Sequence, residues 1–158
     1  PKITVVQATG AAPFARYYSE HAQNFVNEEH PKTLASAIKI GAPVSWQKAW
    51  RAVAETGGSV ITVTEQEIAD AKAMIGRDGI GCEPASATTV AGIRKLVADR
   101  AIGENETVVG VLTGHLLKDT DYVMKYHANT LIGPDGEKIQ GQFVNTPVRS
   151  QDLEDLLD

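Results

Sequence analysis

The chain has a single cysteine, Cys82, among its 158 residues. One cysteine cannot form an internal disulfide, and it cannot supply the thiolate cluster of a structural zinc site. Basic residues are also not in excess, because the formal net charge is −5, and no stretch interleaves basic with aromatic residues. We therefore expect a protein of the reducing cytoplasm that binds neither nucleic acid nor an anionic membrane surface.

Several familiar signatures are missing as well. No apolar run approaches the roughly 20 residues that cross a bilayer, so we predict no membrane segment. The sequence contains no P-loop lysine motif, no GxGxxG and no nucleophile elbow, and its four histidines have no metal-like spacing. We accordingly predict no metal site. A strand pattern follows Pro1 almost at once, so we expect this chain to be a piece of a longer polypeptide.

What is present is an alternation of strand and helix patterns. Strands are predicted at 3–8, 59–63, 80–83 and 108–112, and helices at about 14–25, 46–55, 65–76 and 85–100. Thr64 and Glu67 have the spacing of a capping box, and Ser45 is a suitable N-cap for the second helix. This order predicts an α/β fold with a mainly parallel sheet and right-handed crossovers.

The pattern weakens beyond about Asn129. The run from Gly133 to Gly136 (GPDG) predicts a turn. Residues 148–157 predict a strand end followed by a small acidic helix, with Ser150 as its cap. We predict one domain over residues 1–128 and a C-terminal extension over residues 129–158.

The most informative stretch is 108–115 (VVGVLTGH), which has the pattern of a buried parallel strand followed by a turn of small residues. In open α/β sheets, ligands bind beyond the carboxyl ends of the strands. Thr113 would then place a hydroxyl at the mouth of a site, and Gly114 would let a ligand approach the backbone. The alternative is that Thr113 only caps the next turn. His115 could face the same site.

Glu83 and Ser86 lie at the start of the helix that begins near Pro84. Glu83 could cap this helix or reach into the site, and Ser86 lies in the first turn, where free N–H groups can hold an anion. The small residues of 33–38 either admit a flat ligand or pack tightly on another element. Cys82 is expected to be a small buried side chain rather than a nucleophile.

Five strings together resemble the threonine synthases, in the order found in that family and over residues 1–128. They are 7–14 (QATGAAPF), 33–41 (TLASAIKIG), 43–46 (PVSW), 81–87 (GCEPASA) and 112–115 (LTGH). The resemblance implies a pyridoxal-phosphate enzyme of fold type II, with a three-layer αβα large domain of which residues 1–128 are the C-terminal half. It implies a homodimer that converts O-phospho-L-homoserine and water into L-threonine and phosphate.

The resemblance also implies roles for single residues. The Thr113 hydroxyl would hydrogen-bond the pyridine nitrogen of the cofactor, and a neutral hydroxyl does not force that nitrogen to be protonated. Gly114 would leave room for the ring. The other implied positions are Ala35 and Ser36 beside a face of the ring, Glu83 and Ser86 at its edge, and 7–10 as a wall at the strand end.

Two departures from the family matter. The lysine that forms the Schiff base and the loop that grips the cofactor phosphate lie in an N-terminal part that has no match here, so no catalytic residue is assigned and the chain needs that part for activity. The family usually has Gly where this chain has Leu116, which would narrow the site or shift the turn. The alternatives are another lyase of this fold, such as a threonine dehydratase or a cysteine-synthase-like enzyme, and a non-catalytic binding remnant.

Overall fold

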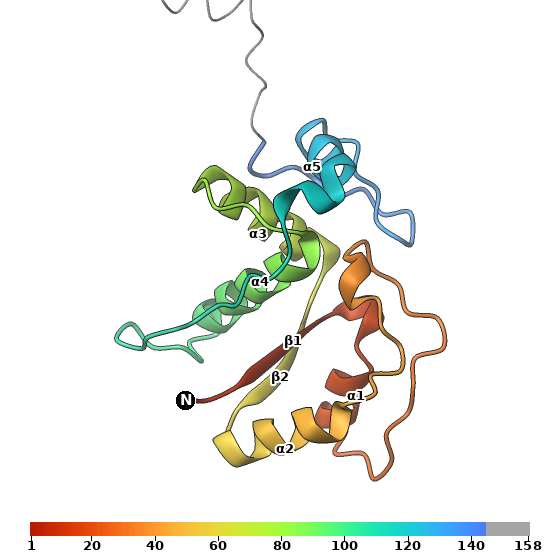
Figure 1. The fold of residues 1–158 in the computed structure, drawn as a ribbon, viewed down its shortest axis with the longest axis vertical. Coiled ribbons are helices and arrows are strands. Elements are labelled where there is room, and N and C mark those ends of the chain that lie inside the picture. Colours follow the sequence, from red (N-terminus) through yellow and green to blue (C-terminus); the bar gives the residue numbers. More distant parts are fainter. Residues whose placement is uncertain (145–158) are drawn as a thin grey trace, which may run out of the picture.

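The computed structural model describes residues 1–144. Two strands, β1 (Thr4–Ala8) and β2 (Ser59–Val63), lie side by side in the middle of the molecule (Figure 1). They pair in parallel, with Thr4 opposite Ser59 and Ala8 opposite Val63. Both strands therefore end at the same edge, and the predicted α/β class with a parallel sheet is confirmed.

Helices occupy most of the connections between and after the strands. None of those in the described part of the chain has the length and apolar character needed to cross a bilayer. The α-helices are α1 (Pro13–Ser19), α2 (Trp46–Thr56), α3 (Glu65–Arg77), α4 (Pro84–Ala98) and α5 (Thr120–His127). The 3-10 helices are η1 (Thr9–Ala11), η2 (Ser36–Ile38) and η3 (Leu116–Asp119).

Alternate residues of the strands face different helices, because successive side chains of a strand point to opposite faces. Val5 and Val60, which are opposite each other, pack in an apolar cluster with Phe14 of α1 and Val53 of α2. Val6 instead packs against a cluster that includes α4 residues. Figure 1 accordingly shows α1 on one side of the strands and α4 on the other.

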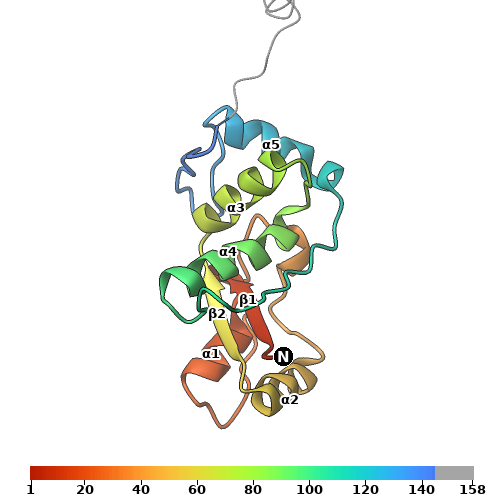
Figure 2. The same cartoon turned by 90° about the vertical axis from the view of Figure 1, so that its left-hand side faces the viewer.

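A buried apolar cluster lies where the two strands end; we call it the strand-end cluster. It contains the last residues of both strands and the inner faces of α3 and α4, and it excludes water from this edge of the sheet. In Figure 2, α3 and α4 gather near these strand ends. Its buried members are Ala8, Val63, Ile68, Ala71, Ile75, Cys82, Ala87 and Ala91.

A second cluster joins α3 to α5 and to the chain that follows α5. Ala69 and Ala73 of α3 pack with Tyr122 and Tyr126 of α5, and with residues that come after residue 128. The hydroxyl of Tyr126 donates to Asp70 Oδ1 at 2.6 Å and accepts from the backbone N–H groups of residues 142 and 143 at 3.1 and 3.2 Å. Tyr126 therefore ties three segments together.

Two of the predicted strands are wrong. Residues 108–112 form no strand, because no strand pairs with them in the described part of the chain; Val109 and Val111 are 82% and 64% exposed. The segment runs along α4 instead, where the Thr89 hydroxyl donates to the carbonyl of Val111. Residues 80–83 form no strand either, because Gly81 has φ +67°, in the left-handed region that interrupts an extended chain.

The helix predicted for residues 14–25 is too long, since α1 ends at Ser19 and His21 has φ +48°. The capping box before α3 is confirmed: the Thr64 hydroxyl accepts from Glu67 N–H, and the Glu67 carboxylate accepts from Thr64 N–H at 2.7 Å. Ser45 occupies the N-cap position of α2, but its side chain makes no capping hydrogen bond.

The predicted turn near residue 134 is confirmed, because Gly136 N–H donates to the carbonyl of Gly133 at 3.0 Å. Residues 148–157 and the cap expected at Ser150 lie outside the described residues.

Replacing Tyr126 with Phe should lower the free energy of unfolding by about 1–3 kcal/mol, because it leaves two backbone N–H groups without their acceptor and Asp70 Oδ1 with only the Gln66 amide as donor. Burial, together with the hydrogen bond to Asp70, raises the pKa of Tyr126 to about 12. The folded state therefore favours the protonated phenol. Its stabilisation is complete below about pH 10 and is lost between about pH 10 and 12. Chemical denaturation across this range should show a shallower loss for Y126F than for the unaltered protein.

Tyr122→Phe is the matched control at neutral pH. The Tyr122 hydroxyl is buried and has no hydrogen-bond partner in the described part of the chain. Its removal should leave stability unchanged or raise it, because an unsatisfied buried polar group is costly. Equal losses in Y122F and Y126F would contradict the role given to the Tyr126 hydrogen bonds.

Candidate functional site

The predicted site residues lie around the strand-end cluster, and three of them are direct sequence neighbours of residues packed in it or on it. Glu83 follows Cys82, Ser86 precedes Ala87, and Thr113 follows Leu112, which packs on the cluster. Each of these polar side chains is thus attached to a residue that is held in the core. This attachment places them at the edge where β1 and β2 end.

Ser86 joins the first turn of α4 to the turn at residues 113–114. Its hydroxyl oxygen accepts the backbone N–H of Thr113 at 3.1 Å and the backbone N–H of Gly114 at 3.0 Å. It also lies 3.3 Å from the Thr113 hydroxyl. Ser86 is only 4% exposed, whereas Thr113 is exposed. The buried hydroxyl of Ser86 therefore holds the exposed hydroxyl of Thr113 in place.

The direction of the hydroxyl–hydroxyl contact follows from counting donors and acceptors. A serine hydroxyl has two acceptor lone pairs and one proton. Both lone pairs of Ser86 are used by the two N–H groups, so its proton is the one that joins it to Thr113 Oγ1. The proton of the Thr113 hydroxyl then remains free to donate outward, to an acceptor that a ligand brings.

Glu83 passes directly beneath this turn. Its backbone N–H donates to the carbonyl of Gly114 at 3.1 Å. A Cβ atom at position 114 would lie 2.1 Å from the Glu83 carboxylate, so only glycine allows the carboxylate to occupy this space. The space beside Gly114 is thus taken by Glu83. The side chain of Glu83 makes no capping hydrogen bond to α4, although the residue precedes Pro84.

The charge of Glu83 is balanced by Lys118, which lies in η3. The Lys118 ammonium is 2.6 Å from Glu83 Oε2, and Glu83 is 5% exposed while the Lys118 side chain is half exposed. The hydrogen bond and the attraction to Glu83 raise the pKa of Lys118. A buried carboxylate without such a partner would be strongly unfavourable. The helix η3 therefore supplies the positive charge that the buried Glu83 carboxylate needs.

Ala35 and Ser36 reach the site from a different segment. Ala35 is fully buried, Ser36 is exposed, and η2, which begins at Ser36, packs against α4. No hydrogen bond joins Ser36 to the side chains of Glu83, Ser86 or Thr113 within the described residues. The structure therefore brings Thr113, Gly114, Glu83 and Ser86 into one hydrogen-bonded group, and η2, which begins at Ser36, packs on the helix that carries Ser86.

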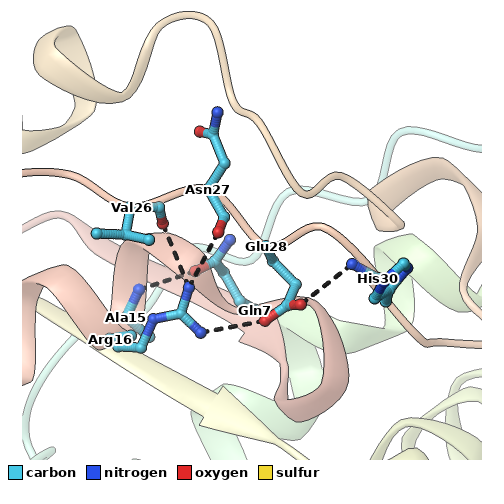
Figure 3. Close-up of polar contacts among 7 residues, drawn as sticks. All are labelled: Gln7, Ala15, Arg16, Val26, Asn27, Glu28 and His30. Atoms are coloured by element: carbon cyan, nitrogen blue, oxygen red, sulfur yellow. Dashed lines mark hydrogen bonds and ion pairs between the residues drawn. The ribbon is translucent and has the colours of Figure 1, made fainter.

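The long loop that delivers η2 is held by Arg16 of α1. Figure 3 shows the Arg16 guanidinium in contact with the carbonyls of Val26 and Asn27 and with the Glu28 carboxylate, which is 3.1 Å away. Gln7 was expected in a wall at the strand end. Its side chain accepts the backbone N–H of Ala15 at 2.9 Å, so it fastens α1 to the end of β1 (Figure 3).

Two other candidate residues have structural contacts. The His115 ring accepts the backbone N–H of Leu117 at 3.1 Å and so caps η3; this is the capping that the alternative interpretation gave to Thr113. Cys82 is buried, and burial raises the pKa of its thiol, as expected of a core side chain. No group of three His, Cys, Asp or Glu side chains within residues 1–144 is arranged to hold a metal ion.

Lys118 is the site residue that sequence reasoning missed. It occurs in the ordinary surface-like string of residues 116–119 (LLKD), and nothing in its spacing points to a residue 35 positions earlier. Only the folding of η3 against the start of α4 brings it to Glu83. The only hint in the sequence is that a buried carboxylate such as Glu83 needs a basic partner, and the sequence does not say which basic residue supplies it.

The donor set fits pyridoxal phosphate at its ring nitrogen. A free hydroxyl proton at Thr113 can donate to an unprotonated nitrogen, whereas a carboxylate at that position would favour the protonated form. The one carboxylate in the group, Glu83, is neutralised by Lys118. The fit rests on Thr113 and on its support by Ser86.

Comparison with known proteins agrees with this chemistry. A family model described as pyridoxal-phosphate dependent enzyme matches residues 1–114. The threonine synthase of Methanosarcina acetivorans is 48% identical over 125 residues, which cover 78% of this chain and 31% of that protein. The threonine synthase of Methanocaldococcus jannaschii is 40% identical over 126 residues, covering 79% and 31%. That of Synechocystis sp. is 42% identical over 130 residues, covering 82% and 31%.

The chain therefore spans about a third of the length of the curated relatives it matches. The resemblance inferred from the five strings is confirmed, because these relatives are threonine synthases.

Replacing Lys118 with Met should lower the melting temperature, because the Glu83 carboxylate would remain buried without a positive partner. Adding Glu83→Gln should recover much of the loss, since the amide needs no counter-charge. Lys125→Met, at an exposed position of α5, serves as the control and should have little effect. A K118M variant as stable as K125M would show that the ion pair contributes nothing.

Proposed function

This chain belongs to the family of pyridoxal-phosphate dependent enzymes, and we propose that it is the C-terminal part of the cofactor-binding domain of a threonine synthase. The complete enzyme would convert O-phospho-L-homoserine and water into L-threonine and phosphate. The observation that carries the proposal is that Ser86 accepts the N–H groups of Thr113 and Gly114, from which we infer that the hydroxyl proton of Thr113 is free at the strand ends. The names of the matched relatives support the same activity.

The proposal assigns residues 1–128 to the C-terminal half of a three-layer αβα large domain and residues 129–158 to an extension. The N-terminal part of the complete polypeptide would supply the reactive lysine, the cofactor phosphate site and most contacts to the substrate phosphate. We propose a homodimer in the cytoplasm, in keeping with the resemblance to the family. Among the described residues, none takes the catalytic role of that lysine.

When bound, pyridoxal phosphate supplies an electron-withdrawing ring that stabilises negative charge next to the substrate amino group. Thr113 would hold the ring nitrogen with a neutral donor, which tunes that withdrawal without fixing a proton on the ring. Ser86 holds the turn by accepting the backbone N–H groups of Thr113 and Gly114, and its hydroxyl also contacts the Thr113 hydroxyl. Glu83 and Lys118 form a neutral pair below, so no net charge competes with Thr113 for the ring.

Ala35 and Ser36 would lie along a face of the ring, where small side chains leave space for a flat group. Gly114 and Glu83 would form its edge. The other activities considered from the sequence, a dehydratase, a cysteine-synthase-like lyase and a non-catalytic remnant, have no observation that favours them.

The complete polypeptide that contains this chain should bind pyridoxal phosphate and release phosphate from O-phospho-L-homoserine. Phosphate release, threonine formation and the visible absorbance of the cofactor are the measurements. Serine and threonine, assayed in parallel for ammonia release, test the dehydratase activity. Turnover of serine or threonine without phosphate release would replace the proposed activity, and a protein that takes up no cofactor would reject it.

Thr113→Val in that polypeptide should reduce kcat by about 100-fold, because a ring that loses its hydrogen bond is held less accurately for reaction. Thermal stability should change little, since one such hydrogen bond contributes about 0.5–1.5 kcal/mol. Thr113→Ser keeps the hydroxyl and is the matched control, with most of the activity retained. Unchanged turnover in T113V would rule out the role given to this hydroxyl.

A further inference from the structure

We propose that Leu116 is a positioning residue that acts through Gly81: its side chain packs on the bare backbone of Gly81 and sets the separation of the two loops that carry Glu83 and Thr113. The catalytic consequence of this contact rests on the proposed function. The contact itself does not.

The close contact between Leu116 and Gly81 leaves no room for a side chain at position 81. A Cβ atom at Gly81 would lie 2.8 Å from Leu116 Cδ2 and 2.9 Å from Leu116 Cβ. Atoms this close cannot coexist, so a side chain at position 81 would push Leu116 away. Because Leu116 Cβ is fixed to the backbone, the displacement would have to include the backbone of η3 and not only the end of a flexible side chain.

Leu116 opens η3, and this makes its position important for the site. Two residues before it, Gly114 bonds Glu83 through its carbonyl and Ser86 through its N–H. Two residues after it, Lys118 pairs with the Glu83 carboxylate. Leu116 therefore sits between the two polar links that join these loops. The apolar contact with Gly81 is the third link.

Sequence resemblance predicted that Leu116, where the family usually has Gly, would narrow the site or shift the turn. In the structure its side chain lies over Gly81 and lines a pocket of about 250 Å³ between α3 and α5. The larger residue at 116 is thus matched by the absence of a side chain at 81. Removing the Leu116 side chain would leave empty space over Gly81. The helix η3 could then move, and Lys118 and Thr113 would move with it.

Gly79 provides a matched control for the conformational cost of altering Gly81. Gly79 has φ +79° and Gly81 has φ +67°, so alanine is strained at both positions. A Cβ atom at Gly79 meets nothing within 4 Å, whereas at Gly81 it meets Leu116. The melting temperature should therefore fall more in G81A than in G79A. Adding Leu116→Gly, which removes both Cβ and Cδ2, should recover part of the fall in G81A and none of the fall in G79A.

The effect on the site is measured in the complete polypeptide with bound cofactor. Leu116→Ala should lower kcat by about 10- to 100-fold, because a displaced Thr113 holds the ring inaccurately. KM should stay within about twofold, since substrate contacts are not removed, and the absorbance band of the bound cofactor should shift. Leu116→Met, which conserves volume, should restore kcat and the band. Leu117→Ala, at the exposed neighbouring position, should leave both unchanged.

The melting temperatures test the contact between Leu116 and Gly81, and the kinetic and absorbance measurements test its effect on the site. Equal recovery of G79A and G81A by L116G, or no recovery of either, would overturn the contact, whatever the enzyme does. Unchanged kcat and absorbance in L116A would overturn the positioning role even with the contact intact. Failure of the unaltered polypeptide to release phosphate from O-phospho-L-homoserine would instead reject the proposed function, while the melting-temperature comparison would still decide the contact.

Discussion

The hydroxyl of Ser86 accepts the N–H groups of both Thr113 and Gly114, and the rest of the site depends on these two hydrogen bonds. They use up the acceptor capacity of Ser86, so its own proton goes to the Thr113 hydroxyl and the Thr113 proton is left for a ligand. Ser86 can do this because it is buried in the first turn of α4. The helix α4 thereby holds the turn at residues 113–114 in place, although Thr113 itself is exposed.

The position of α4 comes in turn from the packing of apolar side chains at the ends of β1 and β2. Ala87 and Ala91 of α4 are buried with Ala8 and Val63, the last residues of the two strands. Small residues on both sides let helix and strands approach closely, which excludes water and gains dispersion contacts. The polar site residues follow directly from this core, because each is the sequence neighbour of a residue packed in it or on it.

The elements that could be predicted are those whose cause is local. The capping box of Thr64 and Glu67 needs residues only three positions apart, and it forms as expected. The segments 80–83 and 108–112 were wrongly predicted to be strands for the opposite reason. A strand exists only when another strand pairs with it, and no pairing partner for Val108 to Leu112 occurs in the described part of the chain. At 80–83 the φ of Gly81 turns the chain, which an apolar pattern does not reveal.

The sequence alone determined the class of the fold, the parallel pairing expected of β1 and β2, and the residue types that surround the site, because periodicity, caps and strings are properties of neighbouring residues. It identified Thr113, Gly114, Glu83 and Ser86 as candidates but not how they act together. Only the tertiary structure decided that Gly114 makes room for the Glu83 carboxylate, that Lys118 neutralises it, and that Leu116 rests on Gly81. Each of these contacts joins the segment just before α4 to the segment from Gly114 to Lys118, and the paired residues are 31 to 35 positions apart. Their separation is set by packing of the helices against the strands, which no local pattern encodes.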